Sequence, residues 1–362
     1  HELIGNERGT HLTVSLERVE LLAKKNIVRV GLSATLGNVN EAGKFLAGNG
    51  RRTAVLVDQS VRRYDIDLNY VKGSLLHVSD YVSNYIRKNV GESKSTILFT
   101  NTRDEAEYLG ALLKAKTPDI PVEVHHGSLS RETREDAESK LRNGEAGVVV
   151  STSSLELGLD IGQVDLVVQS GSSRQSVKLI QRIGRSKHRV GESASGLVVT
   201  NKIDDELEAR ALINRIYTGS LEKSIIHELA LDVLAHHLVG IVMEYGRLSI
   251  NEAITILGKA YPFRDISSED VDLCFKILYK QKILWYDGEE ARGRGLGTYE
   301  YYYHNISTIP DIQQLTVIDR VSDKKVGRLD QVFIGEYGEP GKPFVLKGST
   351  WKIISIDEDK AE

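Results

Sequence analysis

Between residues 95 and 200 the sequence alternates short apolar runs with segments of helical periodicity, and this alternation restricts the possible fold more than any other feature. The apolar runs are TILFT (96–100), PVEVHH (121–126), AGVVVST (146–152), VDLVVQSG (164–171) and ASGLVVT (194–200). The helical segments between them are 102–115, 131–144 and 175–185. Near-continuous apolar strands connected by helices are typical of parallel sheets that are covered on both faces. We therefore predict an α/β fold with a parallel sheet for residues 59–218.

The sequence on either side of this region has a different texture. Residues 11–26 show helical spacing, and the β-branched run Ile27–Leu32 predicts a buried strand, so we interpret residues 1–58 as the end of a preceding α/β domain. After Gly219, three helical segments precede two strands, 282–286 and 298–304, which predicts a winged helix over 219–304. The three helical segments are 225–243, 249–259 and 267–281.

From residue 305 the chain consists of short strand-like runs separated by glycine and aspartate, which predicts a β-rich domain over 305–362. The chain begins with His1 rather than methionine and shows no secretory signal, so we expect it to be a fragment of a longer protein.

Composition excludes some classes of function. The net charge is -4, so contacts with phosphates must depend on local placement of donors rather than on a global positive field. The single cysteine, Cys274, excludes an internal disulfide and a cysteine zinc site, which fits a cytoplasmic location. The longest apolar region, 225–243, is interrupted by histidines and carboxylates, so we expect no membrane association.

Ligands of doubly wound sheets bind at the carboxyl ends of strands, and three polar clusters lie at or behind such ends here. In the first cluster, Thr100, Thr102 and Arg103 stand at the start of a helix, where an anion is favoured. Taken on its own, this cluster is better explained by a plain helix cap at Thr102. The second cluster, residues 151–154, is dense in small hydroxyls suited to a phosphodiester backbone.

The third cluster is the basic stretch QRIGRSKHR (181–189). Gln181 and Arg185 are four residues apart and share a helix face, while Gly184 between the arginines costs about 1 kcal/mol of helix stability and suggests a functional reason. The alternative is a solvated basic helix. The neighbours His125 and His126 point to opposite faces of a strand and cannot share an ion, so we predict no metal site of this chain's own.

In this order, the segments resemble the conserved motifs of superfamily-2 helicases. GLSATLGN (31–38) resembles motif III, TILFTNTRDEAE (96–107) motif IV, VEVHHGSLSRETRED (122–136) motif IVa, STSSLELGLDIG (151–162) motif V and QRIGRSKHR (181–189) motif VI. The opening His1-Glu2-Leu3 resembles the end of a DExH box. Residues 1–20, the stretch from motif V through motif VI, and the tail FVLKGSTWKIISID are similar to the large helicase-related (Lhr) proteins of archaea and bacteria.

This resemblance implies an ATP-dependent 3′-to-5′ translocase on single-stranded DNA that unwinds DNA or RNA:DNA duplexes and is linked to DNA repair. It implies that Arg185 is an arginine finger for the γ-phosphate, which is worth about 10³–10⁵ in rate. His188 stands where many relatives carry a second arginine, which leaves a second finger in doubt. The residues implied in nucleotide binding or sensing are His1, Gly158, Asp160, Gln181 and Arg182, and those implied in coupling are Ser33, Ala34 and Thr35.

The resemblance also implies a backbone-binding set for nucleic acid. This set comprises Thr100, Thr102, Arg103, His126, Gly127, Ser128, Thr152 and Ser154. Trp351 is a candidate base-stacking residue, because a base–aromatic stack is worth about 1–3 kcal/mol, although a core tryptophan is at least as good an interpretation. We assign Trp285 to the core.

The 362 residues contain no G-x-x-x-x-G-K-[ST] phosphate loop and no acidic pair for Mg²⁺. We therefore expect ATP and Mg²⁺ to require a further RecA-like domain, and this chain alone to be inactive. We expect the whole protein to be a monomeric motor acting on single-stranded DNA and on DNA or RNA:DNA duplexes. Two alternatives stay open: an RNA helicase that remodels ribonucleoprotein, and a non-catalytic module that binds nucleic acid or a protein partner.

Overall fold

The computed structural model describes most of the chain as two compact units. One unit comprises residues 1–58 and 222–311, and the other comprises 59–221 and 312–362. The described residues are 2–33, 35–57, 64–89, 95–156, 164–186, 194–307, 314–322, 324–330, 339–346, 348–356 and 360–361. We describe each unit by itself.

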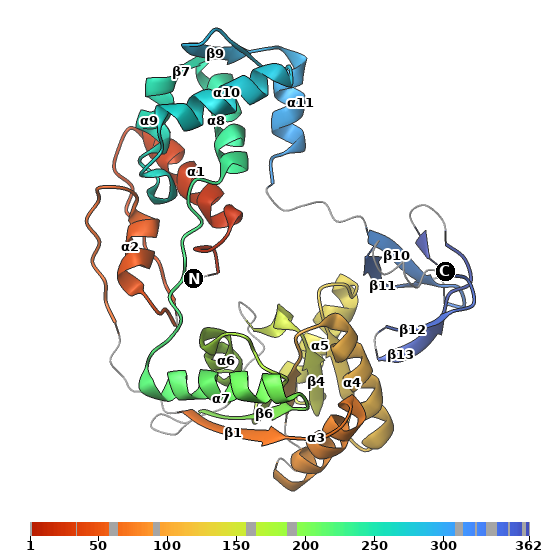
Figure 1. Ribbon diagram of the computed structural model, residues 1–362. Coiled ribbons are helices and arrows are strands. Elements are labelled where there is room, and N and C mark those ends of the chain that lie inside the picture. Colours follow the sequence, from red (N-terminus) through yellow and green to blue (C-terminus); the bar gives the residue numbers. More distant parts are fainter. Residues whose placement is uncertain are drawn as a thin grey trace. The chain divides into compact units, whose positions relative to one another are not determined.

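The unit that contains residues 59–221 is built on a six-stranded sheet in which every strand pairs in parallel with its neighbours (Figure 1). The strand order is β1-β6-β5-β2-β4-β3. The strands are β1 (Tyr64–Tyr70), β2 (Thr96–Phe99), β3 (Val122–His125), β4 (Val148–Ser151), β5 (Leu166–Ser170) and β6 (Ala194–Thr200). The predicted parallel α/β sheet is confirmed.

Successive side chains of these strands enter two different cores, one on each face of the sheet. In β4, Val148 and Val150 face one core, which lies under α3 and α4, while Val149 faces the other, which α5, α6 and α7 cover. This alternation on an all-apolar strand is the reason for the continuous apolar runs in the sequence. The helices are α3 (Leu75–Asn89), α4 (Arg103–Lys116), α5 (Arg131–Arg142), the 3-10 turn η1 (Ser153–Leu155), α6 (Ser176–Ile183) and α7 (Ile203–Thr218).

The β-rich segment belongs to the same unit and shares a core with the parallel sheet. Phe344 and Leu346 are buried in the core under α3 and α4, and Gly327 forms a bridge with Leu129. The peptide N–H of Arg328 also donates to the carbonyl of Ser128 at 2.7 Å. The strands of this segment are β10 (Gln314–Asp319), β11 (Lys324–Asp330), β12 (Pro343–Leu346), β13 (Ser349–Lys352) and β14 (Lys360–Ala361).

The other unit combines the first two helices of the chain with four α-helices and a small sheet from residues 222–311 (Figure 1). Its sheet has the order β7-β9-β8, with antiparallel pairing. Its elements are α1 (Glu7–Ala23), α2 (Val39–Ala47), α8 (Leu231–Tyr245), β7 (Arg247–Ser249), α9 (Ile250–Leu257), η2 (Tyr261–Phe263), α10 (Ser268–Lys280), β8 (Leu284–Tyr286), β9 (Glu290–Gly293) and α11 (Leu296–His304). Capping boxes begin α9 and α10 at Ser249 and Ser267. Within the described ranges, no helix has the length and apolar character needed to cross a bilayer.

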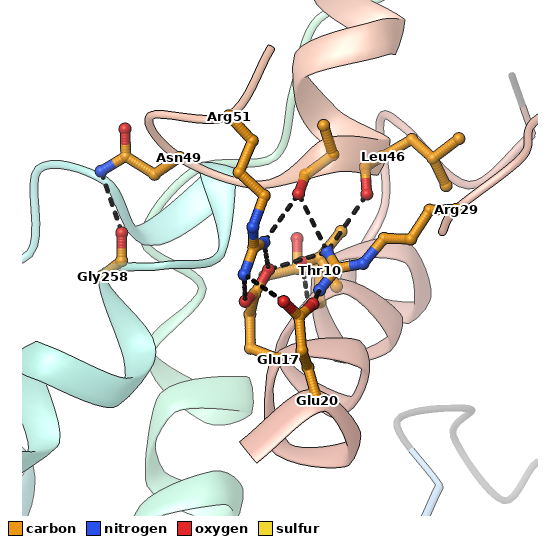
Figure 2. A network of polar contacts seen from close by, with 10 residues as sticks. Thr10, Glu17, Glu20, Arg29, Leu46, Asn49, Arg51 and Gly258 are labelled. Atoms are coloured by element: carbon orange, nitrogen blue, oxygen red, sulfur yellow. Dashed lines mark hydrogen bonds and ion pairs between the residues drawn. The ribbon is translucent and has the colours of Figure 1, made fainter. Parts of the chain in front are cut away.

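A buried carboxylate joins α1 to the segments on both sides of α2 (Figure 2). Glu17 is 1% exposed and accepts hydrogen bonds from Arg29 at 2.7 Å and from Arg51 at 2.6 and 2.7 Å. Glu20 accepts a further bond from Arg29 at 2.7 Å. The backbone carbonyls of Leu46 and Ala47, at the end of α2, also accept from these guanidinium groups. The network fixes residues 29 and 51, which lie before and after α2, on one helix.

Histidines fill the contact between α1 and α8. His236 and His237 are buried, His11 from α1 bonds the ring of His237 at 2.6 Å, and the ring of Tyr302 stacks on His236 at 4.6 Å. Burial, together with the neighbouring His11 and Arg18, lowers the pKa of His236 to about 4. The folded unit therefore holds His236 as the neutral imidazole at neutral pH.

The prediction of a buried strand at Ile27–Leu32 is wrong. These residues have no regular structure, and Val28 and Leu32 are 87% and 96% exposed. A strand needs a neighbouring strand for its backbone N–H and C=O groups, and none of the described strands pairs with this segment. Its apolar side chains consequently have no layer to pack against within the described residues.

The predictions for residues 298–304 and for Trp285 are also wrong. Residues 296–304 form α11, because Tyr301 and Tyr302 pack on the core around α8, whereas the second strand of the hairpin is β9 at Glu290–Gly293. In β8, Leu284 points into the core, so its neighbour Trp285 points outward and is 50% exposed. Helix α8 begins at Leu231, six residues later than expected, after an irregular segment.

Candidate nucleic-acid and nucleotide sites

The carboxyl ends of β2, β4 and β3 are neighbours in the sheet, and three predicted motifs therefore meet at one edge. The N–H of Thr100 donates to the carbonyl of Ser151 at 2.8 Å, and the N–H of Thr152 donates to the carbonyl of His125 at 3.3 Å. These bonds hold the ends of the three strands in register. We call the exposed and half-exposed groups along this edge, Thr102, Arg103, Gly127, Thr152 and Ser154, the strand-end row.

At the strand end after β2, Thr102 and Arg103 lie exposed at the edge of the sheet, whereas Thr100 is buried. Thr102 is the cap of α4, because its hydroxyl accepts from the N–H of Glu105 at 3.2 Å, and both Thr102 and Arg103 are exposed. Thr100 is fully buried, and its hydroxyl donates to the carbonyl of Thr102 at 3.0 Å. In the described structure its hydroxyl shapes the turn before α4, and its contact with nucleic acid stays a prediction.

The two histidines at the end of β3 point to opposite faces of the sheet, as their strand positions predict. His125 bonds Glu138 of α5 at 2.8 Å and the hydroxyl of Ser154 at 2.7 Å, while His126 bonds Glu107 of α4 at 2.8 Å. Burial lowers the pKa of His125, with Glu138 opposing that shift. The two rings thus have separate partners on separate faces.

His126 and Ser128 are buried next to the β-rich segment, and their contact with nucleic acid stays a prediction. His126 is 1% exposed, and the carboxylate of Glu107 that holds its ring also accepts the N–H of Gly348. Ser128 is buried, and its carbonyl accepts from Arg328. The backbone of Gly127, between these two residues, remains exposed at the edge.

Motifs V and VI meet through one buried carboxylate. Glu156 accepts from Arg182 at 3.0 and 3.1 Å, and both side chains are buried. Arg182 also donates to the side-chain oxygen of Gln169 in β5 and lies over the ring of Phe99, 5.2 Å from its centre. Each of the three guanidinium nitrogens of Arg182 therefore has a partner within the domain, and its binding of nucleotide stays a prediction.

Arg185, one turn beyond Arg182, is half-exposed and lies at the end of α6. Its guanidinium donates to the backbone carbonyl of Glu156 at 3.0 and 3.3 Å, so a single residue holds both arginines. Burial lowers the pKa of Arg185 and Glu156 opposes that shift, but a guanidinium remains a cation in either case. Gln181 lies on the same helix and is buried at 8% exposure.

Ser33 and Thr35 belong to the unit that contains α1. Ser33 is exposed, and its hydroxyl donates to the carbonyl of Thr35 at 3.3 Å. Arg29 and Arg51, both anchored on Glu17, stand before and after these two residues in the chain (Figure 2). The predicted site residues His1, Ala34, Gly158, Asp160 and His188 lie outside the described residues.

Trp351 lies in β13, opposite Phe344 of β12. Its ring nitrogen donates to the carbonyl of Leu346 at 2.7 Å, and its side chain packs partly buried against the core under α3 and α4. These contacts hold the ring in one orientation and leave part of it at the surface. Its stacking on a base stays a prediction.

Two domain families match the chain, in the order that the fold displays. Residues 78–191 match the helicase conserved C-terminal domain, and residues 214–362 match the winged helix domain of large helicase-related proteins. The ATP-dependent helicase Lhr-Core of Methanocaldococcus jannaschii is 37% identical over 366 residues, which cover 96% of this chain and 42% of that protein. The chain belongs to the large helicase-related (Lhr) family.

Further comparisons agree with Lhr membership. The ATP-dependent helicase Lhr-Core protein 2 of Thermococcus barophilus is 36% identical over 98% of this chain and 43% of its own length. The structure of the Mycobacterium smegmatis helicase Lhr bound to ssDNA and AMP-PNP aligns with a TM-score of 0.72 and 27% identity, over 82% of this chain and 41% of that one. The chain spans about two-fifths of the length of the curated relatives it matches. The resemblance and the predicted winged helix are confirmed.

Sequence reasoning missed the carboxylates that organise these Lhr motifs. Glu156 sits between two leucines in the run SLELG, and a charged residue inside an apolar run is a detectable sign of a buried ion pair. Glu107 gave no such sign, because it lies on a helix with many charged neighbours. Its partners, His126 and Gly348, become neighbours only when the β-rich segment docks on α4.

Proposed function

We propose that this chain supplies the second RecA-like domain, the winged helix and part of the β-rich domain of an ATP-dependent helicase that moves along single-stranded DNA. The observation that carries the proposal is the arrangement of motif VI, in which Arg182 is buried against Glu156 and Gln169 while Arg185 is partly exposed just past the end of α6. A domain that needed both arginines only for stability would have no reason to present one of them at its surface.

The strand-end row supports the nucleic-acid side of this proposal. A hydroxyl cap, a guanidinium, an exposed glycine backbone and two further hydroxyls lie along neighbouring strand ends. These groups suit phosphodiester oxygens and carry no means of reading base edges. A translocase requires such sequence-independent contacts. Two relatives, the ATP-dependent helicase Lhr-Core and the helicase Lhr bound to ssDNA and AMP-PNP, agree with this chemistry.

In the proposed reaction, Arg185 leaves the carbonyl of Glu156 and contacts the γ-phosphate of ATP, where it stabilises the charge that develops in the transition state. Gln181, on the same helix, lies close enough in sequence to sense the same ligand. Among the described residues, no cluster of three or more histidine, cysteine or carboxylate side chains could hold an ion. We propose that Mg²⁺ and the remaining phosphate contacts are bound by residues outside these 362.

Finer features of the proposal come from the family alone. They are movement in the 3′-to-5′ direction, unwinding of RNA:DNA as well as DNA duplexes, action as a monomer in the cytoplasm, and a role in DNA repair. Parallel unwinding of DNA:DNA, RNA:DNA and RNA:RNA duplexes by the whole protein separates this proposal from that of an RNA helicase.

ATP hydrolysis by the whole protein tests the central claim. Arg185→Ala should lower DNA-stimulated turnover by about 10³-fold or more and leave binding of single-stranded DNA unchanged, because the finger acts on the transition state. Arg210→Ala is the matched control, since Arg210 is an exposed arginine of the same domain that pairs with Glu206 on α7. Turnover of the Arg185 variant within a few-fold of the control variant would refute the proposal.

A further inference from the structure

The small sheet of the winged helix presents a row of cationic and aromatic side chains on its outer face. Arg247 of β7 pairs with Arg292 of β9, and Arg292 pairs with Trp285 of β8. Directly paired residues of antiparallel strands project from the same face of a sheet. The three side chains therefore form one cross-strand row, which together with Arg294 we call the wing face.

The wing face is exposed because the opposite face of this sheet makes the core contacts. The next cross-strand row, which includes Leu248 and Ala291, is buried in the core around α8. On the outer face, the side chains of Arg247 and Arg292 are 73% and 61% exposed, and Trp285 is 50% exposed. A half-exposed indole ring forgoes part of the stabilisation that burial of its apolar surface would give, whereas the neighbouring core positions obtain that stabilisation.

The indole ring of the wing face is already held in place. The guanidinium carbon of Arg294 lies 4.0 Å from the centre of the Trp285 ring, and the ring of Tyr279 on α10 lies 6.2 Å away. A cation over an indole face is favourable, and it fixes the orientation of both groups. Ordering the ring before a ligand arrives removes part of the entropy that binding would otherwise cost.

The charge of the wing face is positive. Three arginines stand on it, and the carboxylate within the row is Glu290, which lies 3.8 Å from Arg247 and 3.5 Å from Arg292. Asp287, at the turn of the hairpin, accepts the backbone N–H groups of Glu289 and Glu290 at 3.0 and 2.9 Å. The arginines therefore outnumber the carboxylate that faces them.

We propose that the wing face is a second contact surface for single-stranded nucleic acid, where one base stacks on Trp285 and flanking phosphates contact Arg247 and Arg292. Aromatic platforms flanked by cations bind single strands without reading sequence, because every base has a flat apolar face and every linkage carries a charge. A protein partner would need apolar area, and the row offers one aromatic ring among arginines. The inference rests on the proposed function, since it adds a contact for the strand that the motor handles.

The two tryptophans of the chain provide a direct test. In a Trp351→Phe variant of the 362-residue chain, Trp285 is the remaining tryptophan, so its emission reports on the wing face. Titration with a 20-nucleotide oligo-dT should quench this emission, whereas an abasic 20-mer, which has the same phosphates and no bases, should leave it nearly unchanged. Anisotropy of the labelled oligonucleotides measures binding in the same samples.

Substitutions separate the two contributions. Trp285→Ala should weaken binding of oligo-dT by about 5-fold or more and leave the abasic strand unaffected, and Trp285→Phe should restore most of the affinity. Arg247→Glu with Arg292→Glu should weaken both strands and lower the salt dependence of binding by about 2 in slope. Arg210→Glu, which reverses an arginine of similar exposure on α7, is the matched control.

Two outcomes overturn the inference, and they differ in what they say about the proposed function. In the first outcome, anisotropy shows binding, but Trp285 emission and the affinity of the wing-face variants are unchanged. This outcome would refute the wing face as a binding surface and would leave the proposed function intact. Absence of binding at low salt for every strand would overturn both.

Discussion

Removal of the charge on Glu17 should destabilise the unit that contains α1 and the winged helix. Glu17 is 1% exposed and receives three hydrogen bonds from Arg29 and Arg51, with N–O distances of 2.6 to 2.7 Å (Figure 2). In Glu17→Gln, the amide keeps the shape of the side chain and one oxygen acceptor, but the other oxygen becomes an NH₂ donor. At least one guanidinium N–H group then loses its acceptor, and the negative charge that both arginines face is removed.

The size of the effect follows from the burial of the partners. Breaking a buried ion pair by removing one partner costs about 3–5 kcal/mol, and the lower end applies here because Glu20 still accepts from Arg29. With a urea m-value of about 2 kcal/mol/M, the unfolding midpoint should fall by about 1.5 M. The matched control is Glu41→Gln, because Glu41 pairs with Lys44 at the surface, where an ion pair contributes about 0–1 kcal/mol.

The dependence on pH gives a second, independent check. Hydrogen bonds from Arg51 and Arg29 outweigh the cost of burial and hold the pKa of Glu17 below its usual value near 4.5. A carboxylate with a lowered pKa stabilises the fold above its unfolded pKa, and that stabilisation is lost as pH falls through the folded pKa. The difference between wild type and Glu17→Gln should therefore be constant from pH 8 to about pH 5 and shrink in more acidic solution.

Urea unfolding followed by Trp285 emission, in the Trp351→Phe background, reports on this unit alone. The reasoning is refuted if Glu17→Gln lowers the midpoint no more than Glu41→Gln does. It is also refuted if the difference between wild type and Glu17→Gln grows as the pH falls below 4.5, because the sign of the linkage would then be reversed.

Three further predictions concern other buried polar groups. Glu156→Gln should cost about 3–5 kcal/mol in urea unfolding, because it leaves the buried guanidinium of Arg182 without its carboxylate. Adding Arg182→Met should recover part of that loss, since the double variant no longer buries an unpaired cation; a double variant no more stable than the single one contradicts this. Lowering the pH from 6.5 to 4 should destabilise the unit that contains α1 and the winged helix by about 3 kcal/mol. The reason is that His236 is protonated in the unfolded chain over this range, whereas in the folded unit it stays neutral down to its pKa of about 4. His236→Leu should flatten the dependence of the melting temperature on pH, and an unchanged dependence would exclude this histidine as the source. Glu107→Gln should speed hydrogen exchange at the N–H of Gly348 by about 10-fold or more while amides of β5 stay protected, and equal exchange in both proteins would show that the carboxylate does not hold the β-rich segment.

The sequence predicted the parallel sheet because the relevant signals are local. A strand such as 148–151 faces two cores, so it is apolar at every position, and the helices between strands repeat at their own period. The placement of polar residues after β2, β3 and β4 then put the motifs at one edge, since parallel strands end on the same side. These steps needed only neighbours in sequence.

The same reasoning failed where the partner of a residue is distant in sequence. His126 looked available for nucleic acid, but the carboxylate that holds it also binds a peptide group 241 positions further along the chain. Trp285 looked like core, but nothing in KILWY indicates which of its two faces turns inward. Burial depends on the elements that pack on a residue, and a local pattern does not contain them.

By itself, then, the sequence determined the alternation of strands and helices between residues 95 and 200, the position of each helicase motif and the family. Only the tertiary structure decided which of two arginines in motif VI is used internally and which is presented at the surface. The reason is physical: Arg182 is buried against Glu156, Gln169 and Phe99, whereas Arg185 is partly exposed and donates to the backbone carbonyl of the same residue, Glu156. Charged side chains of the same type acquire different roles when desolvation and partners differ, and both are set by packing.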